Sequence, residues 1–104
     1  MEKNKQISVV IDGVTYTPVY NMNTMSKFSD RHGLTVEDFT RLSHMSLRHI
    51  LDLVFLGCEE YCRIKKIECP FDVYRIGQLD TDTLSLLIES ISVNMMKLPK
   101  VEGN

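Results

Sequence analysis

Alternating apolar positions near the start of the chain predict a β-hairpin. Residues 7–11, ISVVI, and residues 14–20, VTYTPVY, flank the pair Asp12-Gly13. A two-residue turn suits glycine, which adopts a positive φ without a Cβ clash. Pro18 has no N–H to donate to a ladder, so the second strand either lies at an edge there or ends nearby. An isolated hairpin is marginal in water, so its apolar face should lie on helices. The candidates for that face are Val9, Ile11, Val14 and Tyr16.

A short amphipathic helix is predicted next, over residues 22–32. Its apolar face is formed by Met22, Met25 and Phe28. Asn21 or Asn23 supplies the N-cap, and Gly33 ends the helix. The following stretch opens with T-V-E-D, a capping residue with acids in the first turn, and this predicts another short helix over residues 35–45.

The longest amphipathic segment covers residues 47–67, with Ser46 as its predicted N-cap. Its apolar residues fall within an arc of about 200°, twice the width of a usual surface stripe. That arc holds Leu47, Ile50, Leu51, Leu53, Val54, Phe55, Cys58, Tyr61, Cys62 and Ile64. The remaining arc holds Arg48, His49, Asp52, Glu59, Glu60 and Arg63, with Leu56 alone among them. We interpret Glu59 and Glu60 as a solvated face, with Glu59 paired to Arg63. The pattern therefore predicts a central, nearly buried helix.

The last helix is apolar on two sides. Residues 69–80, CPFDVYRIGQLD, are predicted to form a loop or short turn, and Asp80 or Thr81 opens the helix. Its core stripe is Leu84, Leu87, Ile88, Ile91 and Met95, whereas Leu86 and Val93 fall opposite, with Met96 beside them. Such a helix is either sandwiched in the fold or presents an outward stripe to a partner. Our candidate partner-binding residues are Met22, Met25, Phe28, Leu56, Leu86, Val93 and Met96.

Length and composition fit one small domain. The chain has 104 residues, 43% hydrophobic and 25% charged, close to the globular average. We expect an α+β, mostly helical fold, in which an N-terminal β-hairpin is followed by about four helices packed around the central one. The domain is predicted to span residues 7–97, with the hairpin at 7–20 and the helical part at 22–97. Residues 1–6 are predicted to be a flexible N-terminus, and 98–104 a frayed tail.

The charge balance does not favour nucleic-acid binding. The formal net charge is −2, so no strongly basic face is expected. A helix-turn-helix can be read into residues 35–56, but its second helix would begin LRHILDLVFL, which is apolar where base contacts need polar side chains. A small DNA-binding or adaptor regulatory domain stays as a competing hypothesis.

The sequence offers little for catalysis or metal binding. Cys58 and Cys62 stand at i and i+4, but His49 falls about 180° around the helix from Cys58, so we interpret both thiols as core residues. The glutamates beside them would raise rather than lower a thiol pKa. No glycine-rich phosphate loop, HExxH or GxSxG motif occurs. We expect no cofactor and no enzymatic activity.

No apolar run approaches the roughly 20 residues that a bilayer crossing needs. With three cysteines, an odd number that includes Cys69 and makes no CxxC pair, neither a disulfide framework nor a zinc knuckle is suggested. These features predict a soluble cytoplasmic protein with no membrane partner.

The order of segments resembles the small tail assembly chaperones of long-tailed bacteriophages and gene transfer agents. The resemblance is carried by DGVTYTPVYNMNTMSKFSDRHG at residues 12–33, SLRHILDLVFLGCEEY at 46–61 and LDTDTLSLLIESI at 79–91. Such proteins are similar in having a short extended piece, an asparagine-flanked helix that ends in two acids and a glycine, an apolar helix containing a glycine, and a final helix rich in leucine and isoleucine. Here Ser29 stands where the first acid is often found, which leaves Asp30 alone.

The resemblance implies a non-enzymatic protein that binds the tape measure protein of an assembling tail, keeps it soluble and recruits tail tube subunits. It would act in the cytoplasm of the bacterial host and be absent from the finished particle. Self-association into a homo-oligomer is compatible with this role. Methionine suits an adaptable apolar surface, and the chain has six. A structural tail or head completion protein is the other competing class.

Overall fold

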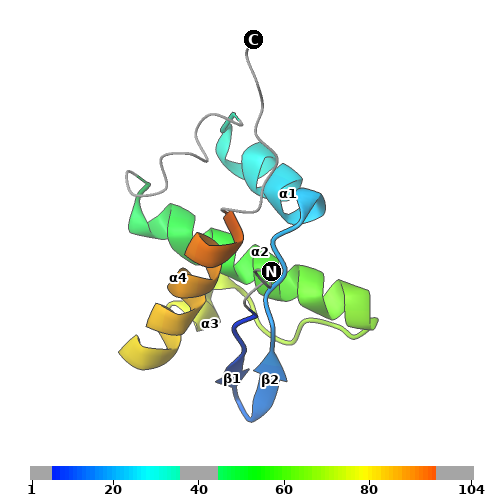
Figure 1. Cartoon of the computed structure of the whole chain (residues 1–104), viewed down its shortest axis with the longest axis vertical. Helices are drawn as coiled ribbons and strands as arrows, with labels where there is room; N and C mark the ends of the chain where they lie inside the picture. The colour runs from blue at the N-terminus through cyan, green and yellow to red at the C-terminus, as the bar shows by residue number, and fades with distance from the viewer. Residues whose placement is uncertain (1–5, 36–44, 96–104) are drawn as a thin grey trace, which may run out of the picture.

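A computed structural model describes residues 6–35 and 45–95 of the chain (Figure 1). Within these residues two strands precede four helices, which confirms the α+β, mostly helical class with an N-terminal hairpin. The elements are β1 (Val9–Ile11), β2 (Val14–Tyr16), α1 (Met22–His32), α2 (Leu47–Lys65), α3 (Val73–Ile76) and α4 (Thr81–Met95). The predicted helix over residues 35–45 falls mainly on residues 36–44, outside the described part, as do residues 1–5, Met96 and the tail.

The hairpin is antiparallel and closes at the predicted turn. Its cross-strand pairs are Val9–Tyr16, Val10–Thr15 and Ile11–Val14. Asp12 and Gly13 both adopt a positive φ, 53° and 83°, as a tight hairpin turn of the primed type requires. Three of the four predicted core residues, Val9, Ile11 and Tyr16, are buried. Val14 is 48% exposed although its cross-strand partner Ile11 is buried, so that prediction is wrong. The difference arises because α4 packs against β1, the strand that carries Ile11. β2 ends before Pro18, as expected.

Helix α1 has the predicted limits because both of its caps form. The Asn21 side chain accepts a hydrogen bond from the N–H of Thr24 at 3.1 Å. Gly33 takes the left-handed conformation, with φ 63°, and its N–H bonds back to the carbonyl of Ser29. The Asn21 side chain pairs with a free N–H of the first turn, and Gly33 closes the last turn. These two caps fix the helix at 11 residues.

Helix α2 is the central element. It runs across the middle of the molecule, with α1 on one side and the hairpin towards the other (Figure 1). Ser46 caps its first turn by accepting from the N–H of His49, and Lys66 ends it in the left-handed conformation. The core gathers along α2 and contains Val9, Ile11, Tyr16, Tyr20, Met25, Phe28, Leu53, Val54, Leu56, Cys58, Cys62, Ile76, Leu87 and Ile91.

Two residues of the predicted apolar arc do not join this core. Leu47 and Ile64 are exposed, because they lie in the first and last turns of α2, beyond the elements packed on its middle. The predicted loop at 69–80 contains α3, whose N-cap Asp72 accepts from the N–H groups of Tyr74 and Arg75. Asp80 opens α4, as predicted, by accepting from the N–H and hydroxyl of Thr83.

The chain before α1 crosses α2 at Gly57. The N–H of Val19 donates to the Gly57 carbonyl at 3.0 Å, so two backbone segments lie against each other. A Cβ built on Gly57 would lie 2.7 Å from the Tyr20 ring, which is closer than real contacts allow. The Tyr20 hydroxyl then reaches Ser90 of α4 at 3.0 Å. Gly57 is therefore the point where Tyr20 links α2 to α4.

Candidate interaction surface

The predicted partner-binding residues divide into a buried and an exposed group. Met25, Phe28 and Leu56 are buried in the core, so the prediction that they offer surface to a partner is wrong for this conformation. Met22 is 57% exposed and Leu86 is 43% exposed. Val93 is half-buried, and Met96 lies outside the described residues. Met22, Leu86 and Val93 are thus the members that the structure leaves accessible.

The exposed group lies on α1 and α4, and Tyr20, two residues before α1, contacts α4. The bond between Tyr20 and Ser90 holds the start of α1 beside the second half of α4. Met22 follows Tyr20 by two residues, and Val93 follows Ser90 by three. Both α1 and α4 pack against α2. We call Met22, Leu86 and Val93 the α1/α4 apolar residues.

Sequence reasoning missed several other exposed apolar side chains. They are Val10 and Val14 on the hairpin, Leu47, Ile64 and Ile67 at the two ends of α2, and Tyr74 on α3. The hairpin alternation could have identified Val10, since it occupies the face opposite Val9 and Ile11. The exposure of the residues at the ends of α2 could not be predicted in this way, because a helical wheel does not show which turns of a helix other elements cover.

Part of the polar arc of α2 is covered by α1 rather than solvated. Leu56, which appeared isolated among polar residues, is buried in one core cluster with Met25 and Phe28. Asp52 and Glu60 stand one turn before and one turn after Leu56 and are 3% and 2% exposed. We call this row, Asp52, Leu56 and Glu60, the α1-facing seam. The predicted solvated position of Glu60 is therefore wrong.

Asp52 receives charge-assisted bonds from the end of α1. Arg31 donates from Nε at 2.8 Å and from Nη2 at 2.7 Å, and the Nε2 atom of His32 lies 2.7 Å from Oδ2. A bidentate guanidinium satisfies both carboxylate oxygens, so burial of the charge is compensated. The same carboxylate raises the pKa of Arg31 by hydrogen bonding.

Glu60 is held at the opposite end of the seam. Arg63 donates to both of its oxygens, at 2.9 and 2.7 Å, and Asn21 Nδ2 donates at 2.8 Å. Hydrogen bonds from Arg63, followed by those from Asn21 and Asn23, lower the Glu60 pKa from 4.5 to about 2. The predicted partner of Arg63 was Glu59, which instead lies 3.5 Å from Lys27 of α1. Helix geometry explains why Arg63 pairs with Glu60 instead of Glu59, since side chains at i and i+3 also lie next to each other on a helix.

Two histidines pack together beside the Asp52 end of the seam. The rings of His32 and His49 lie edge to face with centroids 4.5 Å apart, and Phe28 contacts both. Ser46 Oγ lies 3.1 Å from His49 Nδ1, whereas Asp52 binds His32. A serine triad needs one imidazole that contacts both the hydroxyl and the carboxylate. Here the two groups bind different rings, so the cluster does not form that arrangement.

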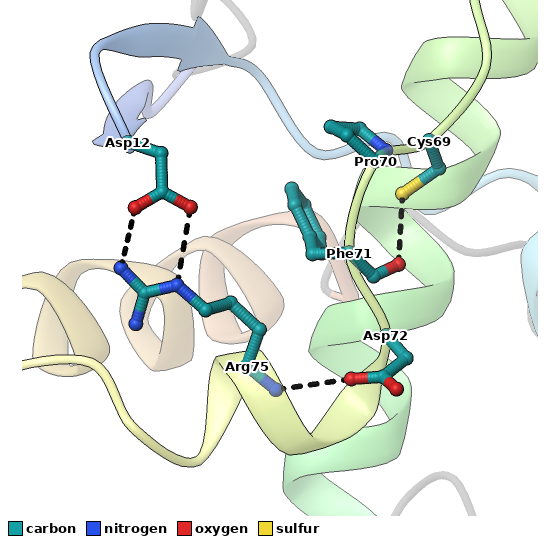
Figure 2. A pocket seen from close by; sticks show the side chains of 6 residues that line it. All are labelled: Asp12, Cys69, Pro70, Phe71, Asp72 and Arg75. Carbon is teal, nitrogen blue, oxygen red and sulfur yellow. Dashed lines mark hydrogen bonds and ion pairs between the residues drawn. The ribbon is translucent and has the colours of Figure 1, made fainter.

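A pocket of about 370 Å³ lies between the hairpin turn and α3. Figure 2 shows the Arg75 guanidinium paired with Asp12, at 2.7 and 3.1 Å, and the Cys69 thiol bonded to the Phe71 carbonyl. Pro70 and Asp72 complete the lining. The ion pair lowers the pKa of Asp12 through hydrogen bonds from Arg75. Asp12 and Arg75 are thus paired with each other, and the third charged side chain, Asp72, caps α3.

All three cysteines are free thiols. Cys58 and Cys62 are buried, as predicted, and Cys69 is half-buried. Among the described residues no group of three or more His, Cys, Asp or Glu side chains is arranged to hold a metal ion. Within the same residues no helix is both long and apolar enough to cross a bilayer.

Comparisons with protein-family models, curated proteins and solved structures found no match for this chain.

Proposed function

We propose that this chain is a non-enzymatic tail assembly chaperone of a long-tailed bacteriophage or prophage. In this role it binds the tape measure protein and tail tube subunits in the cytoplasm of the bacterial host. The proposal is supported by the order of segments in the sequence: a short extended piece, an asparagine-capped helix ending in glycine, a glycine-containing central helix and a leucine-rich final helix.

The observation that carries the proposal is the exposure of Met22 and Leu86 after the core is complete. The core already contains Phe28, Leu53 and Leu87, each of them fully buried. Exposed apolar side chains on helices suit a helical client, because an amphipathic helix presents its own apolar stripe at matching spacing. An unbranched methionine adapts to stripes of different shape.

Masking of this kind needs no chemistry from the chaperone. A tape measure protein is long and helical with apolar faces, so each bound copy removes a segment of apolar surface from water. Burial contributes about 25 cal/mol for each Å² of apolar area. Several copies along one client would keep it soluble until tube subunits replace them, and self-association is compatible with such an array.

Co-expression with a tape measure protein of a long-tailed bacteriophage tests the proposal. The wild-type chain should move the tape measure protein into the soluble fraction. Leu86→Glu and Val93→Glu should reduce that fraction several-fold, because a charge at the contact must be desolvated on binding. Ser85→Glu and Ser92→Glu are matched controls that add the same charge at exposed positions of the same helix.

Two results would contradict the proposal. One is a tape measure protein that stays equally insoluble with and without the wild-type chain. The other is salt-dependent retention of the chain on DNA at moderate ionic strength, which would instead favour the regulatory class. Unfolding of Leu86→Glu, seen by circular dichroism, would contradict only the interface assignment, because it would show that Leu86 supports the fold.

A further inference from the structure

Helix α2 ends in an exposed turn that presents apolar and basic side chains together. The N–H groups of Lys66 and Ile67 donate to carbonyls of the preceding turn, at 3.1 and 3.0 Å, so the helix closes in a Schellman motif. Ile64 and Ile67 are 48% and 49% exposed, and the two lysines between them are also exposed. We call Ile64, Lys65, Lys66 and Ile67 the α2 tip.

Lysine occupies a position in this turn that favours glycine. Lys66 has φ 62°, the left-handed conformation that a Cβ makes unfavourable. No described residue forms an ion pair with Lys66 or with Lys65, which lies with Nζ 5.8 Å from the centre of the Tyr61 ring. The turn contains one exposed acid, Glu68, so positive charge is in excess. Both lysines are therefore available to a partner of negative charge.

The exposed side of α4 has the complementary composition. Helix α4 contains two acids and no basic residue. At 3.6 residues per turn, both acids and two apolar residues fall within an arc of about 60° and alternate along it. We call this row the α4 stripe, and its members are Asp82, Leu86, Glu89 and Val93. Val93 is half-buried and the other three are exposed. Apolar and charged side chains are thus exposed together on both surfaces, with opposite sign.

We propose that the α2 tip of one copy docks on the α4 stripe of a second copy of this chain, head to tail. The lysines of the tip face the acids of the stripe, and the isoleucines cover its apolar residues. Figure 1 shows α4 and the end of α2 that carries the tip on opposite sides of the molecule, so one copy cannot satisfy itself. Contact between unlike surfaces leaves a tip and a stripe unused at the two ends of every complex, so growth continues past two copies.

The contact is small, which sets its strength. One turn and one row of a helix bury less than the roughly 1,200 Å² of a stable interface. Association should therefore be weak, increase with protein concentration and decrease with added salt, which screens exposed charges. The contact does not require the proposed client, although both would use Leu86 and Val93.

Sedimentation velocity of the full chain, from micromolar to millimolar concentration, tests the contact. The average mass of the wild-type chain should pass that of two copies without a plateau and should fall when salt is raised. Ile67→Glu and Leu86→Glu should abolish association. Leu47→Glu is the matched control and should not, because Leu47 is an exposed leucine outside both surfaces.

Lys66→Gly separates the proposed role of this side chain from a structural one. Glycine suits the left-handed position, so the variant should unfold at a higher temperature than the wild type. It also lacks one charge of the tip, so its association should be several-fold weaker. A Lys66→Gly variant that is more stable and associates like the wild type would contradict the proposed role of the lysine.

A mixture of two variants tests the head-to-tail arrangement. Ile67→Glu keeps the α4 stripe and Leu86→Glu keeps the α2 tip, so together they should form one-to-one pairs and nothing larger. Asp82→Lys, at an exposed first-turn position, replaces Leu86→Glu if circular dichroism shows that the latter is unfolded.

Four results would overturn the contact. They are a wild-type chain that stays a single copy at every concentration, association that stops at two copies, folded variants that do not pair in the mixture, and a monomeric chain that binds vesicles of acidic phospholipid through Ile67. The last result would assign the tip to a membrane surface.

Co-expression distinguishes this contact from the proposed function. Ile67→Glu leaves Met22, Leu86 and Val93 intact, so it should keep a tape measure protein as soluble as the wild type does. A chain that self-associates but leaves the tape measure protein insoluble would contradict only the proposed function. A chain that solubilises it while staying a single copy would contradict only the head-to-tail contact.

Discussion

Gly57 is the residue at which local preference and tertiary packing disagree most clearly. Glycine in a helix interior costs about 1 kcal/mol relative to alanine, yet Gly57 lies in the middle of α2. The structure gives the reason, because the Tyr20 ring and Pro18 occupy the space that a side chain would need. Gly77, by contrast, has only ordinary contacts around its Cβ direction.

The substitution Gly57→Ala should therefore lower the free energy of unfolding, although alanine is the better helix former. Overpacking of this kind costs about 1–3 kcal/mol. The upper part of that range exceeds the gain of about 1 kcal/mol in helix propensity from glycine to alanine. Urea denaturation measures the change. Gly77→Ala is the control and should stay within about 0.5 kcal/mol of the wild type. A Gly57→Ala variant more stable than wild type would mean that the Tyr20 ring can move aside.

Glu60 predicts a dependence of stability on pH. Its pKa in the folded chain, about 2, lies below the ordinary value of 4.5. The ionised form is thus favoured by folding, so its contribution is present above about pH 4.5 and is lost as the pH falls through about 2. The difference in unfolding free energy between wild type and Glu60→Gln should shrink across that window.

The neighbouring acid supplies the control for this measurement. Glu59 is more exposed and lies 3.5 Å from Lys27. Glu59→Gln should change the unfolding free energy by less than about 1 kcal/mol at neutral pH, because exposed ion pairs contribute little. Equal effects of the two substitutions at every pH would contradict the assigned role of Glu60.

At the scale of elements, the association of α1 with α2 combines an apolar centre with polar ends. Leu56 packs in one cluster with Met25 and Phe28, Asp52 receives Arg31 and His32, and Glu60 receives Asn21 and Asn23. The polar contacts set the direction of α1, because its first residues match one carboxylate and its last residues match the other. The seam therefore fixes the register of two helices as well as their association.

Asp52→Asn tests this arrangement. The neutral amide lacks the negative charge to which Arg31 and His32 bind. It also places an N–H₂ group next to the Arg31 guanidinium. Arg31 is half-exposed and can return to water, so we expect a loss of about 1–3 kcal/mol in unfolding free energy. Asp30→Asn, at an exposed position of α1 next to Arg31, should have little effect. Equal losses at both positions would show that Asp52 does not hold α1 in place.

At the scale of the whole molecule, Tyr20 connects parts that are far apart in sequence. Its ring lies on Gly57 of α2, and its hydroxyl bonds Ser90 of α4, 70 residues away. Met22 follows Tyr20 by two residues, and Val93 follows Ser90 by three. We therefore expect the Tyr20–Ser90 contact to affect the positions of these two residues of the proposed client surface, although neither Met22 nor Val93 takes part in it.

Tyr20→Phe should weaken this connection without emptying the core. Loss of the hydroxyl should lower the unfolding free energy by about 0.5–1.5 kcal/mol, a limited amount because Ser90 still donates to the Leu87 carbonyl. Tyr74→Phe removes the same hydroxyl from an exposed ring and serves as the control. Hydrogen exchange should be faster in α4 of the Tyr20 variant, and an unchanged exchange rate there would contradict the link.

The sequence determined most of the local elements that the structure describes, and several of their ends. The hairpin turn at Asp12-Gly13 and the caps Asn21, Gly33 and Ser46 follow from rules that act within a few residues. Within the predicted core stripe of α4, Leu87 and Ile91 are buried. These features depend on backbone hydrogen bonds and φ preferences, which neighbouring residues largely set. The expected hairpin-and-helices class is therefore confirmed.

Only the tertiary structure decided which polar residues are inside. Asp52 and Glu60 have the spacing of a solvated helix face, and their burial depends on Arg31, His32 and Asn21, which come from another helix. The same limit applies to Met25, Phe28 and Leu56, because a helical wheel gives the direction of a side chain but not the element that covers it. Burial depends on which surfaces meet, and that choice rests on contacts between residues distant in the chain.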